Sequence, residues 1–153
     1  MSGAVEVESL EGGAGRTVID AEGLILGRMA SVVAQRLLEG ERIEIVNSEV
    51  AVVSGKRLQV IRARKEFLQM GGRGRGPTHW RRPNMIVRRA IRGMLPYRKA
   101  RGREAFKRVR AHIGVPKDLA EAKKETIPEA HVSRLGGRYI TVGEIAANIG
   151  WKR

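Results

Sequence analysis

Three histidines are the side chains in this sequence whose chemistry could support a metal site or acid–base catalysis of RNA cleavage. His79, His112 and His131 share no spacing typical of metal ligands, and the chain has no cysteine. Asp20 and Asp118 are its only aspartates, and no nucleophile signature such as G-x-S-x-G is present. We therefore expect no metal, no cofactor, no small-molecule substrate and no enzymatic activity.

Two glycine-containing runs suggest phosphate binding but match no nucleotide motif. Ser54-Gly55-Lys56 resembles the end of a phosphate-binding loop, yet that motif needs glycine in place of Val50 and serine or threonine in place of Arg57. The Gly-rich run at residues 71–77 lacks the spacing G-x-G-x-x-G. We interpret residues 54–56 as a strand-to-helix turn whose backbone amides can still contact a phosphate.

Positive charge is concentrated in one part of the chain. Between Lys56 and Arg110 there are 19 Lys and Arg residues against only Glu66 and Glu104, a net charge of +17 in a protein whose total is +14. Arginine, which provides 22 of the 30 basic residues, can bond two phosphate oxygens at once. A polyanion bound to this region would relieve its self-repulsion, so nucleic acid is the first hypothesis.

The few aromatic residues favour one mode of nucleic-acid recognition. Only Trp80 and Tyr97 lie in the middle of the basic window, whereas proteins that bind single strands use rows of aromatic side chains on which bases stack. The composition therefore predicts recognition of folded RNA through its shape and its phosphates.

Three consecutive basic segments form the predicted RNA surface: a Gly-Arg loop at residues 71–83, a helix at 84–95 and a basic run at 98–103. The alternatives are an ordinary solvated loop and the solvated side of an ordinary helix. The candidate RNA-binding residues are Lys56, Arg57, Arg73, Arg75, His79, Trp80, Arg81, Arg82, Arg88, Arg89, Arg92, Arg98, Lys99, Arg101, Arg103, Lys107, Arg108 and Arg110.

The elements that must position these residues alternate between strands and helices. We expect strands at 17–20, 42–47, 50–53 and 109–113, and helices at 27–40, 56–70, 84–95, about 103–107 and after the capping box Thr141-x-x-Glu144. Residues 115–137 are mostly loop, with a helical turn near Leu119. In the helix at 56–70, the side chains expected to face inward are Leu58, Ile61 and Leu68. The helix at 84–95 should be capped by Asn84. Its apolar face should consist of Ile86, Val87, Ala90, Ile91, Met94 and Leu95. This alternation predicts an α/β fold with a mainly parallel sheet covered on both faces.

The chain has the length of one domain. Residues 1–15 are acidic and Gly-rich and are expected to form a flexible tail, which leaves a single α/β domain at 16–153 with a basic elaboration at 71–110. No run approaches the length of a membrane span, so we expect a cytosolic protein without a membrane partner.

Several motifs resemble the L-thirteen family of large-subunit ribosomal proteins, in its archaeal and eukaryotic branch. They are Val18-Ile19-Asp20-Ala21, Gly27-Arg28-Met29-Ala30-Ser31, Val46-Asn47-Ser48, Ser54-Gly55-Lys56, the loop Gly74 to Arg81, Arg92-Gly93-Met94-Leu95-Pro96, Arg101-Gly102, Gly143-Glu144-Ile145 and Gly150-Trp151-Lys152. The resemblance implies a three-layer α/β/α sandwich with a four-stranded, mainly parallel sheet and a basic loop-helix extension. It also implies a non-catalytic, cytoplasmic component of the large ribosomal subunit that binds ribosomal RNA beside neighbouring ribosomal proteins and serves translation and subunit assembly.

Two other functions stay open. An enzyme acting on RNA would need His79 or His112 beside carboxylates, which the basic window almost lacks. A free regulatory RNA-binding protein acting off the ribosome would present the same surface. Sedimentation with large subunits would separate that alternative from a ribosomal role. In the ribosomal role, we expect arginine side chains to bridge phosphates of RNA segments that are distant in the RNA sequence.

Overall fold

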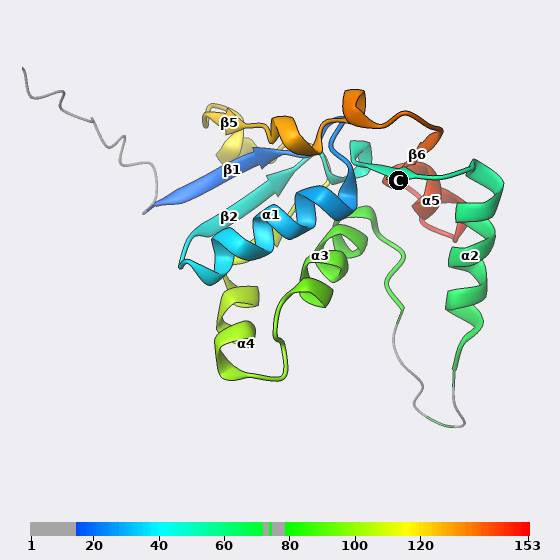
Figure 1. Ribbon diagram of the computed structural model, residues 1–153, viewed down its shortest axis with the longest axis horizontal. Coiled ribbons are helices and arrows are strands. Elements are labelled where there is room, and N and C mark those ends of the chain that lie inside the picture. The colour runs from blue at the N-terminus through cyan, green and yellow to red at the C-terminus, as the bar shows by residue number, and fades with distance from the viewer. Residues whose placement is uncertain (1–14, 72–73, 75–78) are drawn as a thin grey trace, which may run out of the picture.

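A computed structural model describes residues 15–71, 74 and 79–153 (Figure 1). The predicted tail therefore lies outside the described residues except for Gly15, and so do Arg73 and Arg75 of the candidate surface. The helices are α1 (Leu26–Leu38), α2 (Arg57–Gln69), α3 (Pro83–Met94), α4 (Ala100–Lys107) and α5 (Val142–Asn148). The strands are β1 (Arg16–Asp20), β2 (Arg42–Val46), β3 (Val52–Ser54), β4 (Val109–Ala111), β5 (Lys124–Glu125) and β6 (Tyr139–Thr141), and the 3-10 turns are η1 (Ser48–Val50), η2 (Lys117–Leu119), η3 (Pro128–Ala130) and η4 (Val132–Arg134).

A four-stranded parallel sheet in the order β4-β2-β1-β5 forms the centre of the fold. Ile19, Ile43 and Ile45 are fully buried on one of its faces, with Met29, Val33 and other residues of α1 in the same core. The predicted α/β sandwich with a mainly parallel four-stranded sheet is therefore confirmed.

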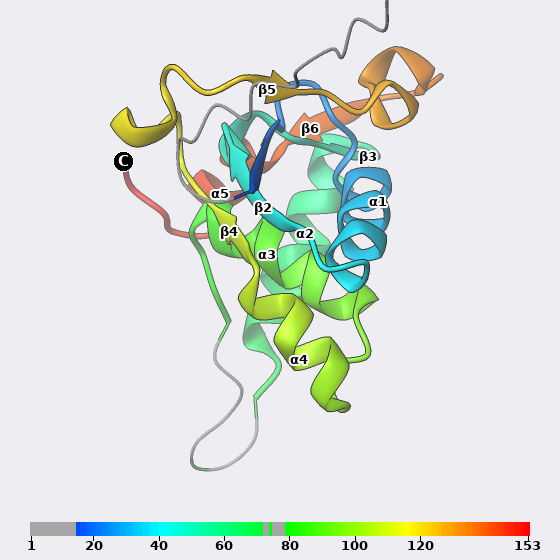
Figure 2. The same cartoon turned by 90° about the vertical axis from the view of Figure 1, so that its left-hand side faces the viewer.

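The two faces of the sheet are covered unequally. Figure 2 shows α1, α3 and α4 on one side, while the segment that carries η2 lies on the other. On this second side Leu119 of η2 packs against Val18 and Val46. Since a three-residue turn covers less area than a helix, much of this face can carry polar side chains.

Strand β3 belongs to a separate two-stranded antiparallel sheet with β6. The expected strand at 50–53 was thus partly wrong, because η1 ends at Val50 and the strand begins at Val52. Helix α2 and helix α5 pack on this small sheet through Ile61, Ile140 and Ile145. The pairing of β3 with the distant residues of β6 is what brings α2 to the edge of the molecule (Figure 1).

Several local predictions were wrong. Leu58, in the first turn of α2, is 77% exposed, whereas Ile61 one turn later is buried against the small sheet. Arg82, not Asn84, precedes α3, since Pro83 occupies the first helical turn, where its missing N–H costs nothing. Helix α4 begins at Ala100, before the expected residue 103. The expectation for residues 115–137 is confirmed, because they are mostly loop with the helical turn η2 ending at Leu119, and they add only the two-residue β5 and the short turns η3 and η4. Among the described residues no helix is both long and apolar enough to cross a membrane.

Candidate nucleic-acid interface

The start of α3 is fixed to the sheet and orients the basic residues before it. Asn84 Nδ2 donates a hydrogen bond to the Ala111 carbonyl oxygen at the end of β4 (3.4 Å). Arg81 and Arg82, just before the helix, are exposed, as is Arg89 one turn after Asn84. These guanidinium groups therefore project from a backbone whose position is set by the core.

Arg88 and Arg92 lie on a small aromatic cluster between α3 and α4. The Arg88 guanidinium carbon is 4.5 Å from the Phe106 ring centre, and that of Arg92 is 4.0 Å from the Tyr97 ring centre. The two rings meet edge to face at 5.6 Å. Such cation–π contacts hold guanidinium groups in place and are worth about 0.5–1 kcal/mol each at exposed sites. Both arginines are half-buried, so they contribute to packing as well as to surface charge.

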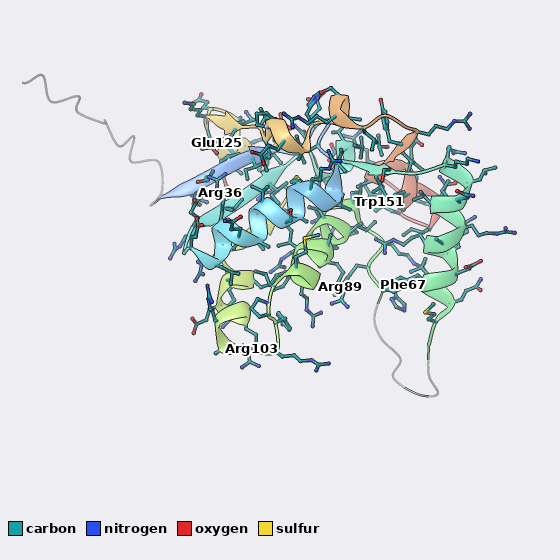
Figure 3. All side chains as sticks on the ribbon, viewed as in Figure 1. Arg36, Phe67, Arg89, Arg103, Glu125 and Trp151 are labelled. Carbon is teal, nitrogen blue, oxygen red and sulfur yellow. The ribbon has the colours of Figure 1, made fainter. Side chains whose placement is uncertain are left out.

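Helix α4 presents the densest exposed charge. Its cations and those just before it are exposed, namely Arg98, Lys99, Arg101, Arg103 and Lys107. Figure 3 shows Arg103 on the part of α4 that projects below α1 and the sheet. The buried Gly102 sets the spacing between α4 and the preceding turn, because a Cβ atom there would lie 2.1 Å from the Pro96 carbonyl oxygen.

A second group of cations lines a cleft of about 500 Å³ at the polar side of the sheet. It contains Lys107, Arg108 and Arg110, which were expected, and also Arg16 and Arg42, which sequence analysis missed. The parallel register places Arg16 of β1 beside Arg42 of β2. It also pairs Glu44 of β2 with Arg110 of β4. No local signal marks Arg16 and Arg42, because they stand outside the basic window and only the strand pairing brings them to it.

Glu44 is a buried carboxylate in the wall of this cleft, only 5% exposed. Its Oε1 accepts a hydrogen bond from Arg16 Nη1 (3.3 Å), and its Oε2 is bonded to His112 Nε2. Burial alone would raise the pKa of Glu44, but the bonds from His112 and Arg16 outweigh it and hold the pKa below its usual value. His112, which lies in a half-buried strand pattern, thus has a structural partner.

Arg108 is tied to the C-terminal end of α1. Its Nη2 donates a hydrogen bond of 2.6 Å to the Leu37 carbonyl oxygen, one of the acceptors that a helix end leaves without an intrahelical partner. Arg108 therefore joins α1 to the segment between α4 and β4 while lining the basic cleft.

The remaining candidates lie around α2. Lys56 precedes the helix, and Arg57 Nε is 3.5 Å from Glu144 Oε2 in an exposed pair of the kind that contributes little to stability. His79 Nε2 lies 3.0 Å from the Met70 carbonyl oxygen at the other end of α2, and Trp80 is about half exposed. The structure thus groups the candidates of α3 and α4, and it separates Lys56 and Arg57 from them along the length of α2 (Figure 1).

Of the two histidines that an RNA-cleaving enzyme would need beside a carboxylate, His112 has such a partner in Glu44, a buried carboxylate that also pairs with Arg16. In the described part of the chain, no three side chains of histidine, cysteine, aspartate or glutamate lie close enough together to hold a metal ion. His79 contacts a backbone carbonyl and the Phe67 ring, not a carboxylate. The arrangement is suited to binding an anion over a large surface.

Comparison with known proteins gives a consistent result. The family model described as "Ribosomal protein L13" matches residues 15–118. Among curated proteins, "Large ribosomal subunit protein uL13" of Methanopyrus kandleri is 48% identical over 139 residues, which are 89% of this chain and 87% of that protein. The protein of the same name from Methanosarcina barkeri is 46% identical over 89% of this chain and 99% of its own length. The protein of this name from Aeropyrum pernix is 41% identical over 94% of this chain and 96% of its own length.

Proposed function

The chain belongs to the ribosomal protein L13 family, and on that premise we propose that it binds and organises large-subunit ribosomal RNA. The members of this family are structural proteins and not enzymes, as the resemblance of the sequence motifs implied. The role of this chain in the ribosome is likewise structural. The RNA contacts proposed here are those of the basic loop, α3, α4 and the cleft beside β2 and β4. Neighbouring ribosomal proteins are its further partners, in the cytoplasm.

The observation that carries this proposal is the unpaired charge of α3 and α4. Among the described residues, none of the ion pairs involves a cation between Arg62 and Arg110. A surface that combines so many arginines with so few carboxylates is repulsive when the protein is alone, and phosphates relieve the repulsion. The charge is also held on helices packed against the core, so little ordering is needed when RNA binds.

The arrangement of the cations supports an architectural mechanism. One group lies on α3 and α4, and the other lies in the cleft that contains Arg16 and Arg42. Lys107 and Arg108 connect the two groups at the end of α4. Two RNA segments that are distant in sequence can be fixed relative to each other by contacting one group each. In this proposal residues 16–153 form the RNA-binding domain, with 71–110 as its basic elaboration, and residues 1–15 are dispensable for it.

The test combines sedimentation with binding at several salt concentrations. We expect the protein to sediment with large subunits in high-salt lysate, whereas a free regulatory RNA-binding protein would stay in the supernatant. With about six to ten phosphate contacts, affinity for large-subunit RNA should fall by about 10³- to 10⁵-fold between 50 and 200 mM salt. An affinity that hardly changes with salt would contradict the proposal.

A matched pair of variants separates local contacts from total charge. Arg98→Ala with Arg103→Ala should weaken RNA binding and reduce its salt dependence, because both side chains belong to the proposed surface. Arg134→Ala with Arg138→Ala removes the same charge from exposed positions outside that surface and should have a much smaller effect. Equal effects of the two pairs would mean that only net charge matters.

A further inference from the structure

A cavity of about 250 Å³ opens between the C-terminal half of α2 and the start of α3. Phe67, Met70, Trp80 and Met85 form apolar walls, while Arg64 and Arg89 also line it. Met70 is 64% exposed and Trp80 51% exposed. Figure 3 shows Phe67 on the side of α2 that faces α3, and Arg89 leaving α3 toward the same space. Apolar walls combined with a few polar groups are common features of ligand-binding cavities.

The cavity continues toward the core. A neighbouring cavity of about 310 Å³, which lies between α2, α3 and α5, shares Arg64, Phe67 and Ile86 with it. Helix α2 is anchored to the small sheet and α5 through Ile61, so its other end reaches past the core. The space between the helices therefore follows from how α2 is anchored.

Several contacts hold the walls in position before any ligand arrives. The Arg64 guanidinium carbon lies 5.6 Å from the centre of the Phe67 ring. The Phe67 and His79 rings meet edge to face at 4.5 Å, and His79 Nε2 is 3.0 Å from the Met70 carbonyl oxygen. Because a carbonyl oxygen only accepts hydrogen bonds, Nε2 carries the hydrogen, which fixes the orientation of the imidazole.

The charge around the cavity narrows the class of ligand. Neither Arg64 nor Arg89 has an ion-pair partner within the described residues, and burial lowers the pKa of Arg64. An apolar side chain of a neighbouring protein would cover the aromatic walls and leave both cations without a counter-charge. A nucleotide brings an apolar ring face and a phosphate together, and proteins bind unpaired bases by stacking them on aromatic and guanidinium planes.

We propose that this cavity binds an unpaired RNA base, stacked on Trp80 and bounded by Phe67 and Met70, with Arg64 and Arg89 contacting its flanking phosphates. The inference rests on the proposed function and adds to it a site that selects single-stranded over duplex RNA. One base-binding site agrees with the scarcity of aromatic residues, since it needs only the few that are gathered here.

The test compares two RNA probes on the full chain. One is a short oligouridylate, whose bases are unpaired, and the other is an RNA duplex with the same number of phosphates. In a Trp151→Phe background Trp80 is the only tryptophan and reports on the cavity by its fluorescence. We expect oligouridylate to quench this emission. Trp80→Ala should lower the affinity for oligouridylate by about 5- to 100-fold and the affinity for duplex by a much smaller factor.

Two further variants complete the design. Met70→Ala should act in the same direction as Trp80→Ala, while Leu58→Ala removes a more exposed apolar side chain of α2 outside this cavity and should have no effect. If oligouridylate does not quench Trp80, or if Trp80→Ala weakens both probes equally, the base site is refuted while duplex binding still supports the proposed function. If neither probe binds the unmodified protein, the proposed function fails as well.

Discussion

Replacing Gly102 by alanine should destabilise the protein although alanine is the better helix former. Gly102 is buried within α4, and a Cβ atom there would lie 2.1 Å from the Pro96 carbonyl oxygen and 2.8 Å from the Tyr97 backbone nitrogen. Backbone atoms cannot rotate aside as a side chain can, so α4 and the turn at 96–97 must separate. That movement also strains the hydrogen bond of 2.9 Å from the Lys99 N–H to the Pro96 oxygen, which precedes the first turn of α4.

The expected change in the free energy of unfolding is the sum of two destabilising contributions and one stabilising contribution. Overpacking costs about 1–3 kcal/mol, and the lost hydrogen bond costs about another 1 kcal/mol. The higher helix propensity of alanine returns about 1 kcal/mol. We therefore expect Gly102→Ala to lower the free energy of unfolding by about 1–3 kcal/mol, which in a protein of this size lowers the Tm by about 2–12 °C.

Gly93 provides the matched control for this experiment. It lies in α3, and a Cβ atom added there would meet no atom within 4 Å. Gly93→Ala should thus raise the free energy of unfolding by up to about 1 kcal/mol. Urea denaturation of the three proteins in one buffer measures both effects. If the two alanine variants shift stability in the same direction, the close approach of α4 to the turn at 96–97 is not the reason why position 102 requires glycine.

Three further predictions concern the core, the stacked arginines and the buried carboxylate. Ile91→Ala should cost about 2–5 kcal/mol of stability, measured by urea denaturation, because Ile91 is fully buried; a thermally silent variant would mean that α3 is rotated. Arg88→Ala with Arg92→Ala should lower both RNA affinity and stability, the latter by about 1–2 kcal/mol, since each guanidinium stacks on a ring; Arg103→Ala, at an exposed position, should lower affinity alone. Burial alone would raise the pKa of Glu44, but its hydrogen bonds lower it, so its contribution to stability should be complete above about pH 4.5 and decline as the pH falls below that value; Glu44→Gln should abolish this decline, and an unchanged pH profile of unfolding would contradict it.

Local sequence patterns predicted the elements whose structure depends on neighbouring residues. The spacing of Ile86, Val87 and Ile91 predicted the buried face of α3, and all three are buried. Thr141 accepts a hydrogen bond from the Glu144 backbone N–H, as the capping box predicted. Met94 has the same period as Ile86 and Ala90 but is 44% exposed, because α3 ends at this residue and the chain turns away.

Features that depend on distant pairing were missed. The strand Tyr139–Thr141 carries no strong hydrophobic pattern of its own and forms by pairing with β3. In this pairing Tyr139 lies opposite Ser54, which stands 85 residues earlier in the chain. Arg16 and Arg42 joined the candidate surface only through the parallel register of β1 and β2. Sequence alone also could not separate Arg88 and Arg92 from Arg89, since only the positions of the Phe106 and Tyr97 rings decide which of the three guanidinium groups is stacked.

The buried carboxylate of Glu44 helps to explain how a cleft with five cations remains part of a stable fold. A carboxylate near these cations offsets part of their mutual repulsion, but an exposed one would also repel the phosphates of RNA. Both oxygens of Glu44 already accept hydrogen bonds, from Arg16 and His112, so its negative charge is offset by these two partners and neither oxygen is left unpaired in the cleft. Arg42, Lys107 and Arg110 are exposed in the same cleft and stay available to the polyanion. Pairing with Arg16 and His112 therefore lets one acidic residue offset repulsion in the free protein without leaving an unpaired carboxylate oxygen in the proposed RNA surface.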